Sequence, residues 1–290
     1  MSNIEKSELI INPDGSIYHL KIKSEHLADT IIIVGDPGRV DQISQHFDHI
    51  EIKIQNREFV THTGTYNNKR LTALATGIGT DNIDIVVNEL DALVNFDLNT
   101  RRRREKLGVL NIIRLGTSGA IQKDIPVNSF VVAEYGLGLD GLIHFYKLEN
   151  EVQENDMTKA FIRHSQWASD LARPYIVKGS APLIDKFGEG MIRGITATSP
   201  GFYGPQGRVL RLDLKYPHIN DLIQSFRFNG YRVTNFEMET SALYALGKML
   251  GHNTVTICAV IANRITGEFN ENYKPLIDKF IVELLNKITV

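Results

Sequence analysis

The sequence has little of several things, and each scarcity excludes a class of protein. The 290 residues include one cysteine, Cys258, so an intrachain disulfide framework is excluded and a reducing compartment is favoured. Acidic and basic residues nearly balance, and a net charge of −2 leaves no basic field for nucleic acid or anionic lipid. No apolar run approaches the length of a membrane span, and the N-terminus lacks a signal-peptide pattern. We therefore expect a cytoplasmic protein without nucleic-acid or membrane partners.

Cofactor signals are equally sparse. The nine histidines are scattered, and none forms a cluster with the cysteine at metal-ligand spacing, so we expect no metal. Residues 136–141 match the G-x-G-x-x-G pattern, but the following residues 142–146 are rich in β-branched and aromatic residues, whereas a dinucleotide fingerprint needs a helix to start inside the motif. We interpret this segment as a loop between strands and expect no dinucleotide cofactor. The basic run Arg101–Arg104 is interpreted as a solvated loop.

The chain is 42% hydrophobic and 23% charged, a composition typical of a folded globular protein. Apolar runs predict strands at 30–34, 71–75, 109–115, 129–133, 191–198, 230–236 and 255–262. Amphipathic patterns predict helices at 40–47, 81–95 (capped by Asp81), 156–172, 218–228, 240–250 (ended by Gly251) and 273–288. The alternation of strands and helices indicates an α/β fold with a mixed or mostly parallel central sheet. Without a linker or repeat, we expect one domain over residues 1–290.

Three predicted strands are followed by loops that contain glycine: GDPGR at 35–39, TGIGT at 76–80 and RLGTSG at 114–119. In open α/β sheets, ligands bind beyond the carboxyl ends of the strands, and glycine lets the backbone approach an anion. Two of the loops also carry an arginine, Arg39 and Arg114, and the loop with Arg114 adds the hydroxyls of Thr117 and Ser118. Arginine forms strong bonds to phosphate, so together these loops predict a phosphate site.

The segment TNFEMETSALYAL at 234–246 places two glutamates, Glu237 and Glu239, between a predicted strand and a predicted helix. Burying an unpaired carboxylate is costly, so two at such a junction need an explanation. A strand-to-helix junction can aim both side chains at one pocket. For Glu237 alone, a favourable interaction with the helix dipole is an alternative.

Seven motifs occur in one order: GDPGR at 35–39, NREF at 56–59, ATGIG at 75–79, RLGTSG at 114–119, GFYGPQGR at 201–208, NFEMET at 235–240 and ANR at 262–264. From about Tyr18 to the C-terminus, the chain resembles the nucleoside phosphorylases of the uridine phosphorylase branch. The resemblance implies a three-layer α/β/α sandwich with a mixed central sheet. It also implies a glycosyltransferase (pentosyltransferase) in which phosphate attacks the anomeric carbon of a nucleoside.

The resemblance also implies a role for individual residues. The phosphate ligands would be Gly35, Arg39, Arg57, Arg114 and Thr117. The ribose contacts would be His19, Glu237, Met238 and Glu239, and the base contacts Phe202, Gln206, Arg208 and Arg264. Arg114, Arg208 and Glu239 would be catalytic. His19 and Arg57 would come from a neighbouring subunit, so the working unit would be a dimer or a dimer-based hexamer.

The ANR motif distinguishes the branches of the resembled family. Purine enzymes and related hydrolases carry an aspartate here, whereas this chain has Asn263-Arg264. We therefore expect a pyrimidine nucleoside, with uridine favoured, and phosphate as co-substrate without a cofactor. The alternatives are a purine nucleoside phosphorylase, a nucleoside hydrolase of the same fold, and a non-catalytic nucleoside-binding protein.

Overall fold

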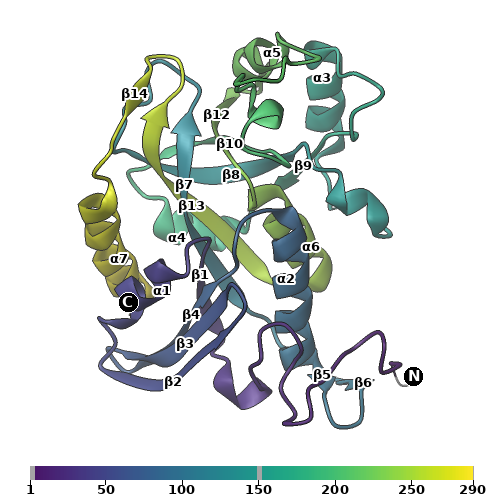
Figure 1. The fold of residues 1–290 in the computed structure, drawn as a ribbon, viewed down its shortest axis with the longest axis vertical. Helices are drawn as coiled ribbons and strands as arrows, with labels where there is room; N and C mark the ends of the chain where they lie inside the picture. Colours follow the sequence, from purple (N-terminus) through teal and green to yellow (C-terminus); the bar gives the residue numbers. More distant parts are fainter. Residues whose placement is uncertain (1–3, 149–151, 290) are drawn as a thin grey trace.

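The computed structural model describes residues 4–148 and 152–289 (Figure 1). The longer strands are β1 (Thr30–Val34), β2 (His49–Asn56), β3 (Phe59–Tyr66), β4 (Lys69–Ala75), β7 (Asn111–Ala120), β8 (Phe130–Gly138), β9 (Tyr175–Lys178), β10 (Ile192–Thr198), β12 (Tyr231–Glu237) and β13 (Asn253–Asn263). Two-residue strands are β5 (Phe96–Asp97), β6 (Arg102–Arg103), β11 (Arg227–Phe228) and β14 (Glu268–Phe269). The helices are α1 (Gly38–Ser44), α2 (Thr80–Asn95), α3 (Asn155–Ser165), α4 (Ala181–Phe187), α5 (Ile219–Ser225), α6 (Thr240–Leu250) and α7 (Lys274–Thr289).

One large mixed sheet organises the chain, with the strand order β11-β12-β10-β8-β13-β7-β1-β4-β3-β2. The pairs β1–β4, β1–β7 and β7–β13 are parallel, whereas β2–β3, β3–β4 and β8–β13 are antiparallel. Strand β12 pairs with β10 and also with β7, so β7, β13, β8, β10 and β12 form a closed ring of strands. The mixed sheet predicted from the sequence is confirmed.

Helices cover both faces of this sheet, which gives the expected three-layer α/β/α sandwich. In Figure 1, α2 and α6 lie on one side of the strands and α1 and α7 on the other. The alternation of side chains along β1 explains the layers, because Ile31 and Ile33 pack toward α2 and α6, while Ile32 and Val34 pack toward α1, α4 and α7. A third cluster, which includes Phe161 of α3, packs α3 and α5 against β10 and β12.

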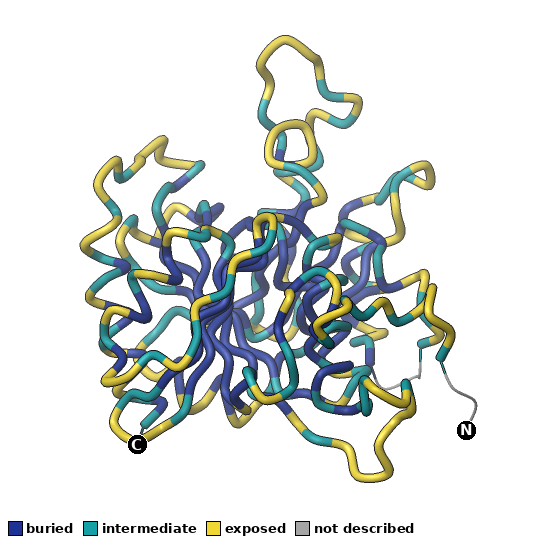
Figure 2. Tube along the Cα trace, turned by 60° about the horizontal axis from the view of Figure 1, so that its bottom comes forward, coloured by how far each residue is buried: buried dark blue, intermediate teal, exposed yellow. Residues whose placement is uncertain are grey.

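Figure 2 shows the buried segments gathered along the central strands, with exposed segments around the outside. Cys258 lies in the centre of β13, and burial raises the pKa of its thiol to about 12. The cysteine therefore stays protonated and is buried, as the sequence predicts, and its Sγ accepts a hydrogen bond from Nη1 of Arg114 at 3.6 Å. Across the described ranges, no helix is both long and apolar enough to cross a membrane.

Several predicted boundaries are wrong, and the reasons are physical. Helix α3 ends at Ser165, where Gln166 takes a left-handed conformation, rather than continuing to 172. Asp81 does not cap α2, because the helix begins at Thr80 after Gly79, whose φ of 101° favours glycine. Residues 49–66, for which no strand is predicted above, form the β2–β3 hairpin.

Of two glycine segments interpreted as loops, residues 114–119 lie wholly in strand β7 and residues 136–141 lie partly in strand β8. Strand β7 extends to Ala120 because its neighbour β13 pairs with it along the whole length. Strand β8 includes the first two glycines of the 136–141 pattern, and a 3₁₀ turn over Leu142–Phe145 follows. Gly116 is required for packing, since a Cβ atom there would lie 2.3 Å from Nη1 of Arg114.

Candidate active site

A cavity of about 670 Å³ opens at the carboxyl ends of β1, β4, β12 and β13, where the predicted loops converge. It gathers all the predicted site residues except His19, Arg57 and Arg264. From the predicted set it is lined by Gly35, Arg39, Arg114, Thr117, Phe202, Gln206, Arg208, Glu237, Met238 and Glu239. Segments separated by about 200 residues in the sequence therefore form one site.

The floor of this cavity is a buried ion cluster of one arginine and two glutamates. Nη1 of Arg114 lies 3.0 Å from Oε2 of Glu237, and Nη2 of Arg114 donates to Glu239. Burial alone would lower the pKa of Arg114, but Glu239 and Glu237 outweigh it and raise the pKa well above its ordinary value. The two carboxylates at this buried junction therefore have a charged partner, Arg114, even without a bound ligand.

The two glutamates are held differently. Glu237 accepts the hydroxyl of Thr198 at 2.6 Å and the backbone N–H of Glu239 at 3.0 Å. Glu239 accepts the N–H of Gly79 at 2.8 Å through its other oxygen, which joins β12 to the 76–80 loop. Glu237 therefore joins its strand–helix junction to Thr198 of β10 and Arg114 of β7, whereas Glu239 joins the same junction to Arg114 and to the 76–80 loop.

Arg39 is buried beside this cluster without a counterion. Its Nη1 donates to the carbonyl oxygen of Leu115 at 3.2 Å. Within residues 4–148 and 152–289, no carboxylate lies at ion-pair distance from its guanidinium group. Burial lowers the pKa of Arg39, although Asp36 partly opposes the effect. A buried guanidinium without a carboxylate is costly, so this part of the cavity is suited to an anion.

Hydroxyl and backbone groups surround the same point. Ser118 is buried in the lining, and its Oγ has no hydrogen-bond partner within the described part of the chain. Gly35 is close enough to the neighbouring loop that a Cβ atom there would lie 3.4 Å from the carbonyl oxygen of Gly77. The 35–39 loop and the 76–80 loop are therefore neighbours at the edge of the cavity, which both Gly35 and Ile78 line.

The opposite wall is the segment 201–208, here called the base loop. The guanidinium carbon of Arg208 lies 3.8 Å from the centre of the Phe202 ring, and Nη1 of Arg208 donates to Oε1 of Gln206 at 2.6 Å. Burial lowers the pKa of Arg208. Gln206 is buried, and a 3₁₀ turn over Gly204–Gln206 sets its position. An aromatic face, an amide and a cation therefore stand together at the mouth of the cavity.

Arg264 lies behind the base loop rather than in the cavity lining. Its Nη1 donates to the backbone oxygen of Gln206, and its guanidinium group lies over the Phe236 ring at 5.9 Å. The neighbouring Asn263 is turned away. Its amide nitrogen donates to the carbonyl oxygens of Gln122 and Ile125, at 2.9 and 2.8 Å. The Asn263 side chain, at the position that distinguishes the branches, is therefore held at the end of β13 by these two carbonyl groups.

His19 and Arg57 lie outside the cavity but close to each other. The side-chain amide of Asn56 donates to the carbonyl oxygen of His19 at 2.7 Å, and Arg57 lies over the ring of the adjacent Tyr18 at 5.6 Å. Glu58 of the same turn approaches Gly77, one residue before the exposed cavity residue Ile78. The two residues that the resemblance assigns to a neighbour thus form one cluster beside the rim of the cavity.

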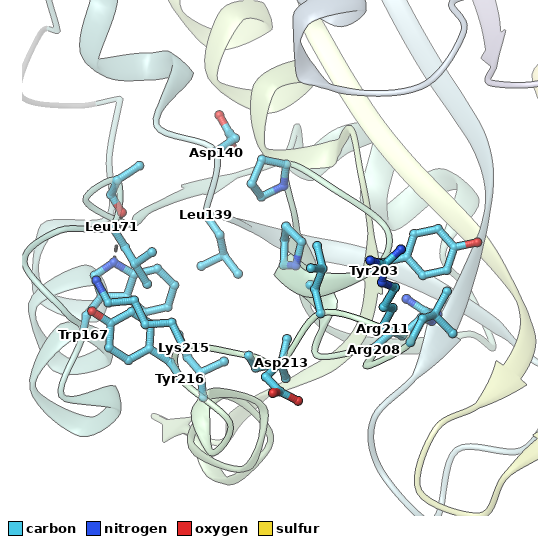
Figure 3. A pocket seen from close by; sticks show the side chains of 18 residues that line it. Leu139, Asp140, Trp167, Leu171, Tyr203, Arg208, Arg211, Asp213, Lys215 and Tyr216 are labelled. Atoms are coloured by element: carbon cyan, nitrogen blue, oxygen red, sulfur yellow. Dashed lines mark hydrogen bonds between the residues drawn. The ribbon is translucent and has the colours of Figure 1, made fainter.

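A larger cavity, of about 900 Å³, adjoins the other side of the base loop (Figure 3). Trp167 and Tyr216 lie at one end, Tyr203 and Arg208 at the other, and Leu139 between them. The lining is largely apolar, and Arg208 is its one member from the predicted site among the described residues. The smaller cavity contains the buried charges, so we take it as the candidate active site.

Sequence reasoning missed several lining residues, among them Phe236, Ile261 and Tyr273. They are apolar or aromatic residues of strands and of the segment before α7, and their types carry no chemical signal. Across the described ranges, there is no group of three His, Cys, Asp or Glu side chains arranged for a metal ion.

Comparison with known proteins identifies the family of this chain. The family model of the phosphorylase superfamily matches residues 29–284, which include β1 to most of α7. The chain belongs to the phosphorylase superfamily. Within this superfamily, a uridine phosphorylase of Thermococcus kodakarensis is 32% identical over 266 residues, covering 89% of this chain and 81% of that protein. A DeoD-type purine nucleoside phosphorylase of Bacillus thuringiensis is 28% identical over 251 residues, covering 86% and 88%.

A solved structure shares this fold. The Trypanosoma brucei nucleoside phosphorylase, described as showing uridine phosphorylase activity, has a TM-score of 0.83 and 30% identity. The comparison covers 96% of this chain and 98% of that one. A second solved structure, from an analysis of two uridine phosphorylases of Phytophthora capsici, has a TM-score of 0.69 and 23% identity, which supports the fold alone.

Proposed function

We propose that this protein catalyses the reversible phosphorolysis of uridine, giving uracil and ribose 1-phosphate. Both the Thermococcus kodakarensis relative and the Trypanosoma brucei structure are described with uridine phosphorylase activity. The observation that carries the phosphate requirement is Arg39, a buried cation without a carboxylate partner in the described chain. Such a reaction is a step of pyrimidine salvage.

Phosphate would bind between Arg39 and Arg114, close to Gly35 and Thr117. Arg39 supplies the unpaired positive charge, and Arg114, whose Nη atoms hold Glu237 and Glu239, would offer its Nε, which has no hydrogen-bond partner within the described residues. Together with the nearby hydroxyls, these donors match the acceptor oxygens of phosphate. Arg57 would add a further cation from a neighbouring subunit. This set supports phosphorolysis over hydrolysis, since water as nucleophile needs no cluster of arginines.

The sugar would lie over Met238 and Glu239, with Glu237 behind them. The Glu239 carboxylate would accept hydrogen bonds from the ribose hydroxyls and favour positive charge on the ring. A phosphate oxygen then bonds to the anomeric carbon while the bond from that carbon to N1 of the base breaks. The electron pair of that bond leaves with the base, so no external oxidant or reductant takes part.

The base would stack on Phe202, with its polar edge toward Gln206, whose amide offers both a donor and an acceptor. Arg208 would leave its stacked position beside Phe202 and stabilise the negative charge on the departing base. Arg264 would support this edge through the Gln206 backbone. Asn263 supports a pyrimidine, because its amide is occupied by two carbonyl groups and offers no acid to a purine nitrogen.

We further propose that the active site is shared between subunits. His19 and Arg57 form one cluster at the rim of the cavity rather than within it, and Ile78 and Tyr18 beside them are exposed. A dimer, or a hexamer built from such dimers, could bring this cluster to a second copy's cavity. Each chain would act as a single domain in the cytoplasm.

The test is uridine consumption followed by ultraviolet absorbance, with and without inorganic phosphate, beside inosine and thymidine. The proposal predicts turnover of uridine that requires phosphate. Turnover without phosphate would indicate a hydrolase, and turnover of inosine alone would favour the purine branch. Tight binding without turnover would indicate a nucleoside-binding protein.

A further inference from the structure

Glu89, in the middle of α2, forms hydrogen bonds with His19. Its Oε1 lies 2.7 Å from Nδ1 of His19 and accepts the backbone N–H of His19 at 2.9 Å. Its Oε2 accepts the N–H of Leu20 at 2.9 Å and a second contact from the His19 N–H at 3.2 Å. One carboxylate therefore fixes both the backbone and the ring of this histidine, from a helix about 70 residues away in the sequence.

The ring is held from other sides as well. The His19 ring packs edge-on against Tyr18, with ring centres 4.7 Å apart, and against Phe59 at 6.3 Å. Asn56 holds the His19 carbonyl oxygen at 2.7 Å. Within the described part of the chain, Nε2 of His19 has no hydrogen-bond partner. The constraints thus leave one ring atom for an external partner.

The carboxylate also determines which nitrogen carries the proton. An ionised carboxylate is an acceptor only, so Nδ1 of His19 must donate to it. In the neutral ring, Nε2 then has a lone pair and accepts a hydrogen bond. A hydroxyl group is the matching ligand, because it can donate its proton to this atom.

We propose that Glu89 is a positioning residue, which sets the tautomer and orientation of His19 so that Nε2 accepts the 5′-hydroxyl of the nucleoside bound in a neighbouring subunit. This inference rests on the function proposed above and on the shared site. A purely structural role is the competing explanation: Glu89 would anchor residues 18–20 to α2, and the nitrogen that carries the proton would be irrelevant to turnover.

The Glu89→Gln substitution separates the two explanations. Glutamine keeps the size of the side chain and one oxygen for the backbone N–H groups. With the glutamine oxygen in the place of Oε2, it still accepts the N–H groups of Leu20 and His19, and the NH₂ group faces Nδ1. That NH₂ group can only donate, so the histidine proton would move to Nε2. The anchor would persist, while Nε2 would turn from acceptor to donor.

The readout is kcat/KM for uridine and for 5′-deoxyuridine, which lacks the hydroxyl in question. We expect Glu89→Gln to lower kcat/KM for uridine about tenfold, the equivalent of about 1.4 kcal/mol or one good hydrogen bond. For 5′-deoxyuridine the change should stay within about twofold, since no such bond exists. The matched control is Asp84→Asn, which alters another α2 carboxylate that accepts from Asn88 and Tyr146 but does not contact His19. It should leave the ratio of the two substrates unchanged.

A second readout is independent of activity. Nitrogen-15 NMR of the histidines, with His19→Asn to assign the signal, should show the proton on Nδ1 in the unaltered protein and on Nε2 in the Glu89→Gln variant. Equal losses for both nucleosides, or the same tautomer in both proteins, would overturn the inference while uridine phosphorolysis stands. Failure of the unaltered enzyme to consume uridine would instead remove the proposed function, and this inference with it.

Discussion

Replacing Arg114 with alanine tests the buried ion cluster and the phosphate site together. The guanidinium group contacts Glu237 at 3.0 Å and also Glu239, and it lies at the floor of the cavity. The substitution removes a cation from the phosphate and leaves two carboxylates buried without their partner. Two separable losses follow, one in stability and one in turnover.

The stability loss is estimated from the burial of the cluster. Breaking a buried ion pair by removing one partner costs about 3–5 kcal/mol. Gly79, Thr198 and the backbone N–H of Glu239 still donate to the stranded carboxylates, which favours the lower end. The turnover loss is estimated from the removal of one charged donor to the reacting group, about 10²- to 10³-fold in kcat.

The assay combines denaturant unfolding with kcat measured at saturating phosphate, at a temperature where the variant is folded. The matched control is Arg232→Ala, because Arg232 pairs with Asp124 at the surface. That substitution should cost at most about 1 kcal/mol and leave turnover unchanged. If Arg114→Ala stays folded and keeps phosphate-dependent turnover within about tenfold of the original, the phosphate site is misplaced.

Three further substitutions give distinct results. Glu239→Gln should impair uridine more than 2′-deoxyuridine, and equal effects on their kcat/KM would reject the ribose contact. Asn263→Asp should lower the unfolding free energy by about 2 kcal/mol or more, because a carboxylate would face the carbonyl oxygens of Gln122 and Ile125. The variant should not act on inosine. Turnover of inosine by this variant would contradict our account of position 263. Burial lowers the pKa of His62 below its ordinary 6.5, so the folded protein holds this ring in its neutral form. The stability that the neutral ring contributes is complete above pH 6.5 and is lost as the pH falls through the folded pKa. Denaturation between about pH 8 and pH 5 should therefore show a larger loss of stability for the original protein than for His62→Gln; identical pH curves would refute it.

The layers of the fold could be predicted because the buried strands are short apolar runs. β1 matches the expected residues 30–34, and α6 matches 240–250 with Gly251 at its end. Strand β2 was not predicted, although Ile50, Ile52 and Ile54 alternate with polar residues, a pattern typical of a strand with one face exposed. The closed ring of strands depends on the pairing of β12 with β7, a contact between distant segments that no local pattern encodes.

The site divides in the same way. The loops that form it were visible as glycine and arginine after strands, and the structure brings ten of the thirteen predicted residues into one lining. Their partners were not visible, because the Arg114 ion cluster depends on the relative placement of β7 and β12. The contact between Glu89 and His19 could not be predicted for the same reason, since α2 and residue 19 meet only in the folded chain.

The most direct test of the account follows the phosphate itself. The enzyme would be incubated with uridine and inorganic phosphate, and the products separated and examined by phosphorus-31 NMR. Phosphorolysis predicts uracil and ribose 1-phosphate in equal amounts, with an equal loss of inorganic phosphate. Free ribose with the phosphate unchanged would contradict the role assigned to Arg39 and Arg114, and with it the central claim.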